Sequence, residues 1–329
     1  MNRTRNEKKN LLILTPVFND WESLRLLLGE FDEILHQNGL RANVLAVDDS
    51  STISFDEAGF APENFKAIDN VSVLELTRNM GHQRAIALGF SYIHFNIECD
   101  AIIVIDGDGE DDPADVPRLI ERCSETNSTK MVFARRAERS EGIVFKTFYV
   151  LYKLLYRILT GREIRSGNFS IVPYGLLSRL VCVSEIWNHY SVGVIKARLP
   201  RVEIVTNRRE RLAGESKMNF VSLVAHGLSA ISVYADVVGI RLLLSTMVLI
   251  VLSIIGILIT VAVRLTTDAA IPGWATTLTG ILFLVALQAS ALSVFFVFIV
   301  LNSRNNISFL PVKDYLPFIL RLRKVYPAK

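Results

Sequence analysis

Two long stretches without a charged residue limit what this chain can be. Residues 242–263 contain no Asp, Glu, Lys or Arg, and neither do residues 269–303. A helix of about 20 apolar residues crosses a hydrocarbon core about 30 Å thick, and both stretches reach that length. The sequence therefore predicts two transmembrane helices joined by a short loop. The alternative is a hydrophobic hairpin buried in a large soluble core.

The basic residues around these stretches predict their orientation, because Lys and Arg concentrate on the cytoplasmic side of membrane helices. The expected connecting loop carries Arg264, whereas both outer flanks are rich in Lys and Arg. The flanking residues are Arg208, Arg209, Arg211, Lys217 and Arg241 before the first stretch, and Arg304, Lys313, Arg321, Arg323, Lys324 and Lys329 after the second. Both chain termini are therefore expected in the cytosol.

Charge and cysteine usage argue against several other classes of protein. The chain has 36 Lys and Arg against 33 Asp and Glu, a net charge of +3, so no global basic field for nucleic acid is expected. Cys99, Cys123 and Cys182 are scattered and odd in number, which favours buried thiols in a reducing compartment. The apolar run after the basic N-terminal segment is too short for a signal peptide, so the bulk of the chain is expected in the cytosol.

Residues 11–135 alternate short apolar runs with amphipathic stretches, a pattern typical of βαβ units on a mostly parallel sheet. The predicted strands lie at 11–18, 42–50, 71–79, 100–108 and 130–136, and the predicted helices at 21–39, 82–95 and 116–125. Three of the strands stop at acidic sequences: TPVFND (15–20), VDDSS (47–51) and DGDGEDDP (106–113). One such stop is typical of a helix cap or turn, whereas three at one edge favour a ligand site beyond the carboxyl ends of the strands.

The acidic run after residue 105 differs from one kind of cation site and agrees with another. An EF-hand loop is excluded, because Asp111 stands where that loop needs Gly and Pro117 where it needs Glu. Two carboxylates separated by one residue can instead hold Mg²⁺ or Mn²⁺ against a substrate diphosphate, and a solvated acidic loop is the alternative. Asp111 and Asp112 are expected to cap the helix entered at Pro113.

Seven motifs in order resemble the family 2 glycosyltransferases. They are TPVFND, VDDSS, NMGHQRAIALGF, DGDGEDDP, ARR, SGNF and RLAGESK, spread over residues 11 to about 220. Within that family the chain resembles the polyprenyl-phosphate glycosyltransferases related to dolichyl-phosphate mannose synthase and the bacterial enzymes acting on undecaprenyl phosphate. The resemblance implies an α/β nucleotide-diphospho-sugar transferase domain (GT-A, Rossmann-like) followed by a two-helix transmembrane hairpin.

The resemblance also implies a reaction and a location. It implies inverting, metal-dependent transfer from a nucleotide-diphosphate sugar, UDP-linked more than GDP-linked, to a polyprenyl phosphate, with Mg²⁺ or Mn²⁺ as cofactor. The protein would be multi-pass in the inner (cytoplasmic) membrane, act at its cytosolic face in building the cell envelope, and could form a homo-oligomer. The expected divisions are a catalytic domain at 1–218, an amphipathic juxtamembrane helix at 219–240, the two spans at 241–303 and a basic cytosolic tail at 304–329. Residues 143–160 are also expected to form a helix at the membrane surface or against the catalytic core.

Site residues carry over by matching motif positions. Glu110 stands where the family commonly has Gln, and the segment 164–169 lacks an Asp that many relatives carry, so its contacts are unassigned. The residues implied for the nucleotide are Pro16, Phe18, Asp20, Asp48, Asp49, Asn79, Gln83, Asp106 and Gly107. Those implied for the metal are Asp106, Asp108 and Glu110, and those implied for catalysis are Asp108, Arg135, Lys146, Arg211 and Lys217.

Three alternative functions stay open at this point. A hydroxyl acceptor would need a carboxylate base, for which Glu185 is the candidate outside the acidic run. A processive polysaccharide synthase would be expected to carry the motif Gln-x-x-Arg-Trp. None of the three tryptophans is preceded by Gln-x-x-Arg. A non-catalytic membrane scaffold with a transferase-like domain would be expected to have lost Asp108 or Lys217, and both are present.

Overall fold

The chain forms two compact units in a computed structural model that describes residues 10–60, 64–136, 143–163, 166–207, 209–213, 220–267, 273–305 and 309–327. We call Met1–Phe148, Ile164–Val233 and Ser308–Lys329 the α/β unit. Tyr149–Glu163 and Tyr234–Ile307 form the helical unit. Each unit is described by itself.

The α/β unit is built on a mixed sheet that has eight strands within the described residues, in the order β7-β5-β6-β4-β1-β2-β3-β8. Strand β1 lies parallel to β2 and β4, β2 to β3, and β5 to β7, whereas β6 and β8 run antiparallel to their neighbours. The strands are β1 (Asn10–Val17), β2 (Arg41–Asp48), β3 (Ile68–Leu76), β4 (Ala101–Val104), β5 (Met131–Arg136), β6 (Ser166–Pro173), β7 (Arg201–Thr206) and β8 (Ile319–Tyr326). The strands predicted before residue 137 are confirmed.

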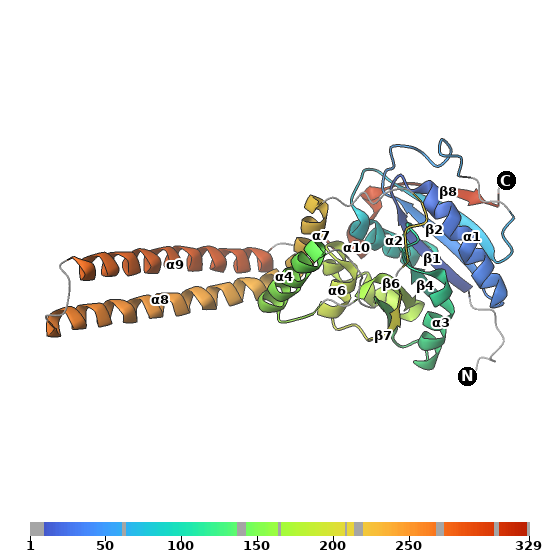
Figure 1. Cartoon of the computed structure of the whole chain (residues 1–329). Coiled ribbons are helices and arrows are strands. Elements are labelled where there is room, and N and C mark those ends of the chain that lie inside the picture. The colour runs from blue at the N-terminus through green and yellow to red at the C-terminus, as the bar shows by residue number, and fades with distance from the viewer. Residues whose placement is uncertain are drawn as a thin grey trace. The chain divides into compact units, whose positions relative to one another are not determined.

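Helices cover both faces of this sheet (Figure 1). Helices α1 (Trp21–Gln37) and α3 (Val116–Glu125) pack on one face, and α2 (His82–Asn96), α5 (Leu177–Leu180) and α6 (Tyr190–Lys196) pack on the other. Strand β1 is apolar at every position from Leu11 to Leu14 because both of its faces are buried. Leu11 and Ile13 pack in the core on one face of the sheet, and Leu12 and Leu14 pack in the core on the other.

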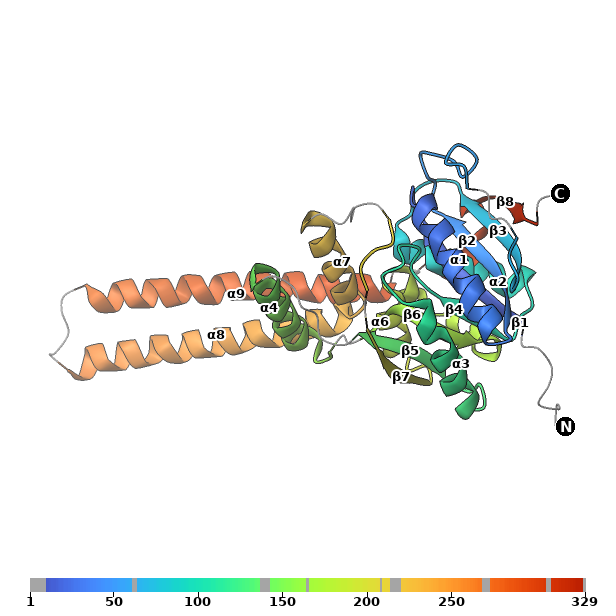
Figure 2. The same ribbon diagram turned by 45° about the vertical axis from the view of Figure 1, so that its right-hand side comes forward.

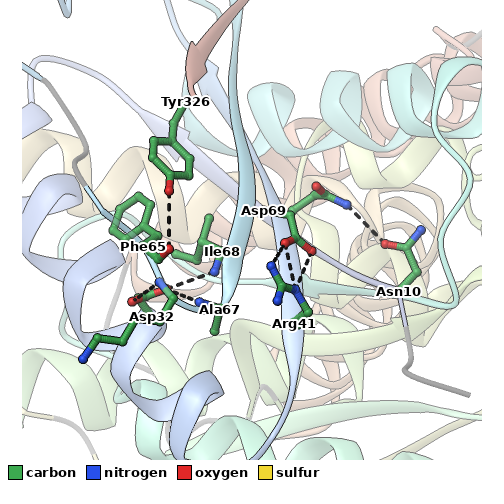
Figure 3. A network of polar contacts seen from close by, with 10 residues as sticks. Asn10, Asp32, Arg41, Phe65, Ala67, Ile68, Asp69 and Tyr326 are labelled. Atoms are coloured by element: carbon green, nitrogen blue, oxygen red, sulfur yellow. Dashed lines mark hydrogen bonds and ion pairs between the residues drawn. The ribbon is translucent and has the colours of Figure 1, made fainter. Parts of the chain in front are cut away.

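A polar network fastens the edge of the sheet where the parallel strands begin (Figure 3). The buried carboxylate of Asp32, on α1, accepts backbone N–H groups of Ala67 and Ile68 at 2.7 and 3.0 Å, and so fixes the start of β3. Arg41 and Asp69 pair at the starts of β2 and β3. These contacts lie at the opposite edge from the acidic stops, which leaves the carboxyl edge for the site.

The residues after the second span do not form a separate tail, contrary to the expected division at 304–329. Ile319–Tyr326 adds β8 to the sheet beside β3, and Arg321 Nε lies 2.7 Å from Oε2 of Glu75. Short helical turns, α10 (Pro311–Asp314) and η4 (Leu316–Phe318), precede this strand. The basic residues balance an acidic edge of the sheet, so the end of the chain belongs to the α/β unit.

The helical unit contains two helices long and apolar enough to cross a membrane, Ala235–Thr266 and Trp274–Asn302. They belong to α8 (Ala235–Thr266) and α9 (Trp274–Asn305), which lie side by side and antiparallel in both views (Figures 1 and 2). In their most apolar windows, 11% and 6% of the residues are buried. Such exposure is far from that of core helices in a soluble protein and agrees with lipid-facing surfaces.

Small side chains let α8 and α9 approach closely. Gly239, Thr246, Ser253 and Thr260 recur every seven residues along α8, and Thr246 Oγ1 lies 2.6 Å from the Ser293 hydroxyl oxygen on α9. A Cβ at Gly239 would lie 2.7 Å from a Val300 methyl group. Small residues and hydroxyl pairs at one seam are typical of helix packing in membranes.

The expected single helix at 219–240 is also not observed. Helix α7 (Phe220–Ser232) ends in the α/β unit, and α8 begins at Ala235. The carbonyl oxygen of Val233 accepts a hydrogen bond from Lys196 Nζ at 2.7 Å, which anchors the break between the two helices. The first apolar helix therefore begins at Ala235, before the predicted start of the spans at 241.

Helix α4 (Ile143–Thr160) agrees with the helix expected at 143–160. Within the helical unit its end is held by Arg241, whose Nη1 donates to the carbonyl oxygen of Ile158 at 2.6 Å. Tyr156 is buried, whereas Val150, Leu154 and Ile158 are exposed. An exposed apolar face beside a candidate membrane helix agrees with the expected position at a membrane surface.

Candidate functional site

The sheet brings one end of each of its eight described strands to the same edge. Strands β1, β2, β3 and β4 run in the same direction, and β5 and β7 share it because antiparallel β6 separates them from β4. Their carboxyl ends therefore meet the amino end of β6. This edge gathers all three acidic stops and the segment beginning at Ser166, as expected for a ligand site in an open α/β sheet.

Residues 106–112, the acidic loop, follow β4 and cross this edge. A Cβ at Gly107 would lie 3.1 Å from the carbonyl oxygen of Pro16, so glycine lets the loop lie against the end of β1. Gly109 has φ +74°, a conformation that favours glycine. Asp112 accepts the N–H of Ala114 at 2.9 Å, which confirms its predicted capping role.

Residues 209–213, the basic strap, lie on the acidic loop. The N–H of Arg209 donates to the carbonyl oxygen of Glu110 at 3.0 Å, and the N–H of Leu212 to that of Asp108 at 3.2 Å. The Arg209 side chain donates to the carbonyl oxygen of Gly109 at 2.7 Å and pairs with Glu30. The strap is thereby held in register with the carboxylates.

The strap places one predicted catalytic residue at the acidic loop. Arg211 Nη2 lies 2.7 Å from Oδ1 of Asp20, and its Nη1 lies 3.9 Å from Oδ2 of Asp108. The Arg211 side chain is only 15% exposed. Three predicted site residues from the ends of β1, β4 and β7 are therefore brought together, and their charges partly balance.

The predicted nucleotide residues lie at the ends of β1, β2 and β3. Asp48 and Asp49 are buried, and burial raises the pKa of both carboxyls above the ordinary value near 3.8. Asp49 accepts the N–H groups of Met80 and Gly81 at 2.6 and 2.8 Å, so it ties the loop after β2 to the start of α2. Asn79, in the loop between β3 and α2, is exposed.

Asn19 joins the first two of these loops. Its side-chain oxygen accepts the N–H of Thr52 at 2.9 Å, and its own N–H donates to the Ser51 hydroxyl at 2.9 Å. Phe18 and Asp20 flank it in sequence, and Asp20 precedes the first residue of α1. The three loops predicted to hold the nucleoside thus form one connected surface.

His82 belongs to the site but was not predicted from the sequence. Its Nε2 lies 3.1 Å from Oδ1 of Asp106. Burial lowers the pKa of His82, but the charge of Asp106, their hydrogen bond, and the charges of Asp108 and Asp49 outweigh burial and raise it above 6.5. Its position directly after the NMG segment at the start of α2 was the available signal.

Gln83 requires a correction, because its predicted contact with the nucleotide does not match its surroundings. The side chain is 8% exposed. Its Oε1 accepts the N–H of Tyr190 at 2.7 Å, and its Nε2 donates to Oδ1 of Asn168 at 3.2 Å. Both ends of the Gln83 amide therefore bond to other protein groups, and one of these, Asn168, contacts Asp106.

Of the remaining basic residues predicted for catalysis, the structure describes one fully and the other two in part or not at all. Arg135 lies near the end of β5, where it pairs in register with Ser166 of β6 and Val205 of β7. Lys146 lies on α4, but its side chain is outside the described residues, as is all of Lys217. Their roles stay predictions.

The acidic loop does not form the three-carboxylate metal site predicted from Asp106, Asp108 and Glu110. No group of three or more His, Cys, Asp or Glu side chains among the described residues is arranged to hold a metal ion. The backbone N–H of Glu110 donates to Oδ1 of Asp108 at 3.1 Å, and the carbonyl oxygen of Glu110 accepts the N–H of Arg209 at 3.0 Å. Asp106 and Asp108 still fit a hard cation, because Mg²⁺ usually takes one or two protein carboxylates and completes its shell with phosphate and water oxygens.

Glu185, the candidate base for a hydroxyl acceptor, is engaged elsewhere. Its Oε1 lies 3.3 Å from Lys196 Nζ, the same ammonium group that bonds to Val233. The 3₁₀ turn that carries it, η3 (Ser184–Trp187), packs against α2 and α6. These contacts give Glu185 a structural role and remove its support as a base.

Comparison with known proteins gives concordant matches. Residues 12–179, slightly more than half of the chain, match the family described as glycosyl transferase family 2. An undecaprenyl-phosphate 4-deoxy-4-formamido-L-arabinose transferase of Klebsiella pneumoniae (strain 342) is 28% identical over 219 residues, covering 66% of this chain and 64% of that protein. The uncharacterized glycosyltransferase YkcC of Bacillus subtilis (strain 168) is 28% identical over 274 residues, covering 80% of each chain.

Solved structures are similar as well. Glucosyl-3-phosphoglycerate synthase from Mycobacterium tuberculosis, in complex with Mn²⁺, UDP-glucose and phosphoglyceric acid, aligns with a TM-score of 0.48 at 14% identity. The alignment covers 70% of this chain and 80% of that one. Mannosyl-3-phosphoglycerate synthase from Rubrobacter xylanophilus aligns with a TM-score of 0.46 at 15% identity, covering 69% and 73%.

Proposed function

The chain belongs to glycosyl transferase family 2, and we propose that it transfers a sugar from a nucleotide-diphosphate sugar to a polyprenyl phosphate, with inversion. One observation carries the proposal: Arg211 lies between Asp20 and Asp108 at the carboxyl edge of the sheet. Relatives named as undecaprenyl-phosphate sugar transferases support the acceptor, although the chain spans only 64% of the first of them. The two apolar helices support a membrane location.

The donor is proposed to bind across the ends of β1 to β4. Pro16, Phe18, Asp20, Asp48 and Asn79 would contact the nucleoside, with uridine favoured, while Asp49 holds their loops together through Met80 and Gly81. A Mg²⁺ or Mn²⁺ ion held by Asp106 and Asp108 would supply positive charge to the departing nucleoside diphosphate. Arg211 would add a cation beside the same phosphates.

The acceptor needs no protein base in this account. A phosphate monoester has its second pKa near about 6, so it is largely dianionic at neutral pH. One of its oxygens would attack the anomeric carbon, while the bond from that carbon to the diphosphate oxygen breaks and the nucleoside diphosphate leaves with the electron pair. Arg135, Lys146 and Lys217 are proposed to offset the repulsion between the two anionic substrates.

Location follows from the chemistry of the acceptor. A polyprenyl chain stays in the bilayer and exposes only its phosphate, so a catalytic unit carried by two membrane spans would meet it at the surface. We propose the cytosolic face, with both termini in the cytosol, because the basic residues flank the two spans on their outer sides.

The test is product formation by the full chain. Membranes containing the protein are incubated with a panel of UDP- and GDP-sugars and undecaprenyl phosphate, with and without Mn²⁺, and the lipids are analysed by mass spectrometry. We expect a glycosylated undecaprenyl phosphate that requires Mn²⁺ or Mg²⁺. Undecaprenol serves as the matched acceptor without phosphate, and transfer to it instead would support a hydroxyl-acceptor enzyme. A folded protein that forms no product with any donor would support the scaffold.

A further inference from the structure

The segment Ser166–Phe169, unassigned in the sequence, lies beside the acidic loop. Strand β6 runs antiparallel to β4, with Ser170 opposite Val104, so Asn168 faces the residues just past the end of β4. Its Nδ2 donates to Oδ1 of Asp106 at 3.2 Å. Asn168 therefore contacts the first carboxylate of the acidic loop directly.

Hydrogen bonds fix which end of the Asn168 amide faces Asp106. The backbone N–H of Tyr190 can only donate, and it bonds to Oε1 of Gln83 at 2.7 Å. The Gln83 amide must then turn its Nε2 toward Asn168, where it donates to Oδ1 at 3.2 Å. Consequently the Nδ2 of Asn168 points to Asp106 and to Nε2 of His82, which lies 2.8 Å away. The relay from Tyr190 through Gln83 and Asn168 then has a single polarity.

Burial makes this polarity costly to reverse. Asn168 is 7% exposed, and both Gln83 and Tyr190 are buried as well. Reversing either amide would set oxygen against oxygen and leave a buried polar atom unpaired. Ser170 further holds the Asn168 backbone, because its buried hydroxyl donates to the Asn168 carbonyl oxygen at 2.8 Å.

We infer that Asn168 and Gln83 are positioning residues that hold the Asp106 carboxylate in one orientation, toward the cation and diphosphate of the donor. This inference rests on the proposed function. Asn168 acts on Asp106 directly, and Gln83 acts only through Asn168. Groups behind a metal ligand commonly orient it in this way, and their loss costs about 10–100-fold in metal affinity or activity.

The test measures Mn²⁺ binding to the full chain in detergent, in the presence of UDP, by the electron paramagnetic resonance signal of free Mn²⁺. Asn168→Ala removes the donor to Asp106. Gln83→Glu leaves no donor for Asn168 Oδ1, so the Asn168 amide must turn its oxygen toward Asp106. We expect each variant to weaken Mn²⁺ binding at least about 10-fold. In the double variant Gln83→Glu should add nothing to Asn168→Ala, because the relay is already broken.

Ser91→Ala is the matched control, since it deletes another buried polar group of α2, the hydroxyl that donates to Ala87. It should change only the unfolding temperature, which is measured for every variant. Two folded single variants that bind Mn²⁺ as tightly as the unmodified chain would overturn the inference, and so would fully additive losses. If the unmodified chain itself shows no Mn²⁺ binding with UDP, the proposed function fails, and the inference fails with it.

Discussion

The guanidinium of Arg211 lies 3.9 Å from the carboxylate of Asp108. A backbone bond between their neighbours, from the N–H of Leu212 to the carbonyl oxygen of Asp108, keeps the strap in this position. The arrangement unites a carboxylate that can hold a cation and a cation that can face a phosphate. Donor binding would then place the diphosphate between charges that the fold has already set in place.

Replacing Asp108 by Asn tests the acidic loop. Asn keeps the size of the side chain and an acceptor for the N–H of Glu110, so the fold should persist. The loss of negative charge should reduce metal-dependent transfer by about 100-fold or more. Asp115→Asn is the control, because Asp115 pairs with Arg118 at the start of α3. Initial rates with the identified donor, measured beside circular dichroism, check the prediction, and near-normal turnover of Asp108→Asn would refute the site.

Gly109→Ala tests the contact between the loop and the strap. A Cβ there would lie 2.4 Å from a Leu212 methyl group, and the φ of +74° adds a cost of about 1–2 kcal/mol for any residue but glycine. We expect the strap to shift, so that transfer falls by more than about 10-fold, with a lower unfolding temperature. Gly175→Ala, with open space around its Cβ, should leave both unchanged. Equal behaviour of the two variants would show that the strap is not held as described.

Strand β8 should matter to the fold of the α/β unit. Deleting residues 319–329 exposes the edge of β3 and leaves the buried Glu75 without Arg321, so the unfolding temperature should fall by several degrees. Arg321→Ala alone should lower the unfolding temperature less than the deletion does, because the Arg321 side chain is largely exposed. Lys324→Ala is the control. An unchanged melting curve after the deletion would mean that the segment is a tail after all.

The packing of α8 against α9 can be tested at one buried glycine, Gly239, and one exposed glycine, Gly280. Gly239→Leu drives a side chain into Val300, whereas Gly280, on α9, has nothing within 4 Å of its Cβ position. We expect Gly239→Leu to destabilise the helix pair by about 1–3 kcal/mol and Gly280→Leu to have little effect. Thermal unfolding in detergent compares them. A larger loss from Gly280→Leu would contradict the described packing.

Much of this architecture follows from local patterns in the sequence. The strands and helices before residue 137 were predictable because parallel strands buried on both faces read as continuous apolar runs. The resemblance to family 2 glycosyltransferases, the GT-A fold class and the two apolar helices are confirmed. Strand β8 was not predicted, because it pairs with β3 across most of the chain, although its alternating Leu and Arg residues were a signal.

The site was predictable only in part, for a physical reason. Acidic residues at strand ends reveal themselves in sequence, and Asp20, Asp108 and Arg211 do meet. The partners of Asp106 were not evident in the sequence, since His82 reaches it from the start of α2 and Asn168 reaches it because β6 lies antiparallel beside β4. Which carboxylates converge depends on the path of the loop, and this is why the sequence predicted three metal ligands although no group of three is arranged for a metal ion among the described residues.

The most direct measurement of the central claim is an experimental structure of the full chain with UDP and Mn²⁺, in which anomalous scattering locates the manganese ion. The account predicts manganese bound by Asp106 and Asp108 and by diphosphate oxygens, with the uridine across the ends of β1 to β3. Manganese and diphosphate bound away from the carboxyl edge of the sheet would contradict it.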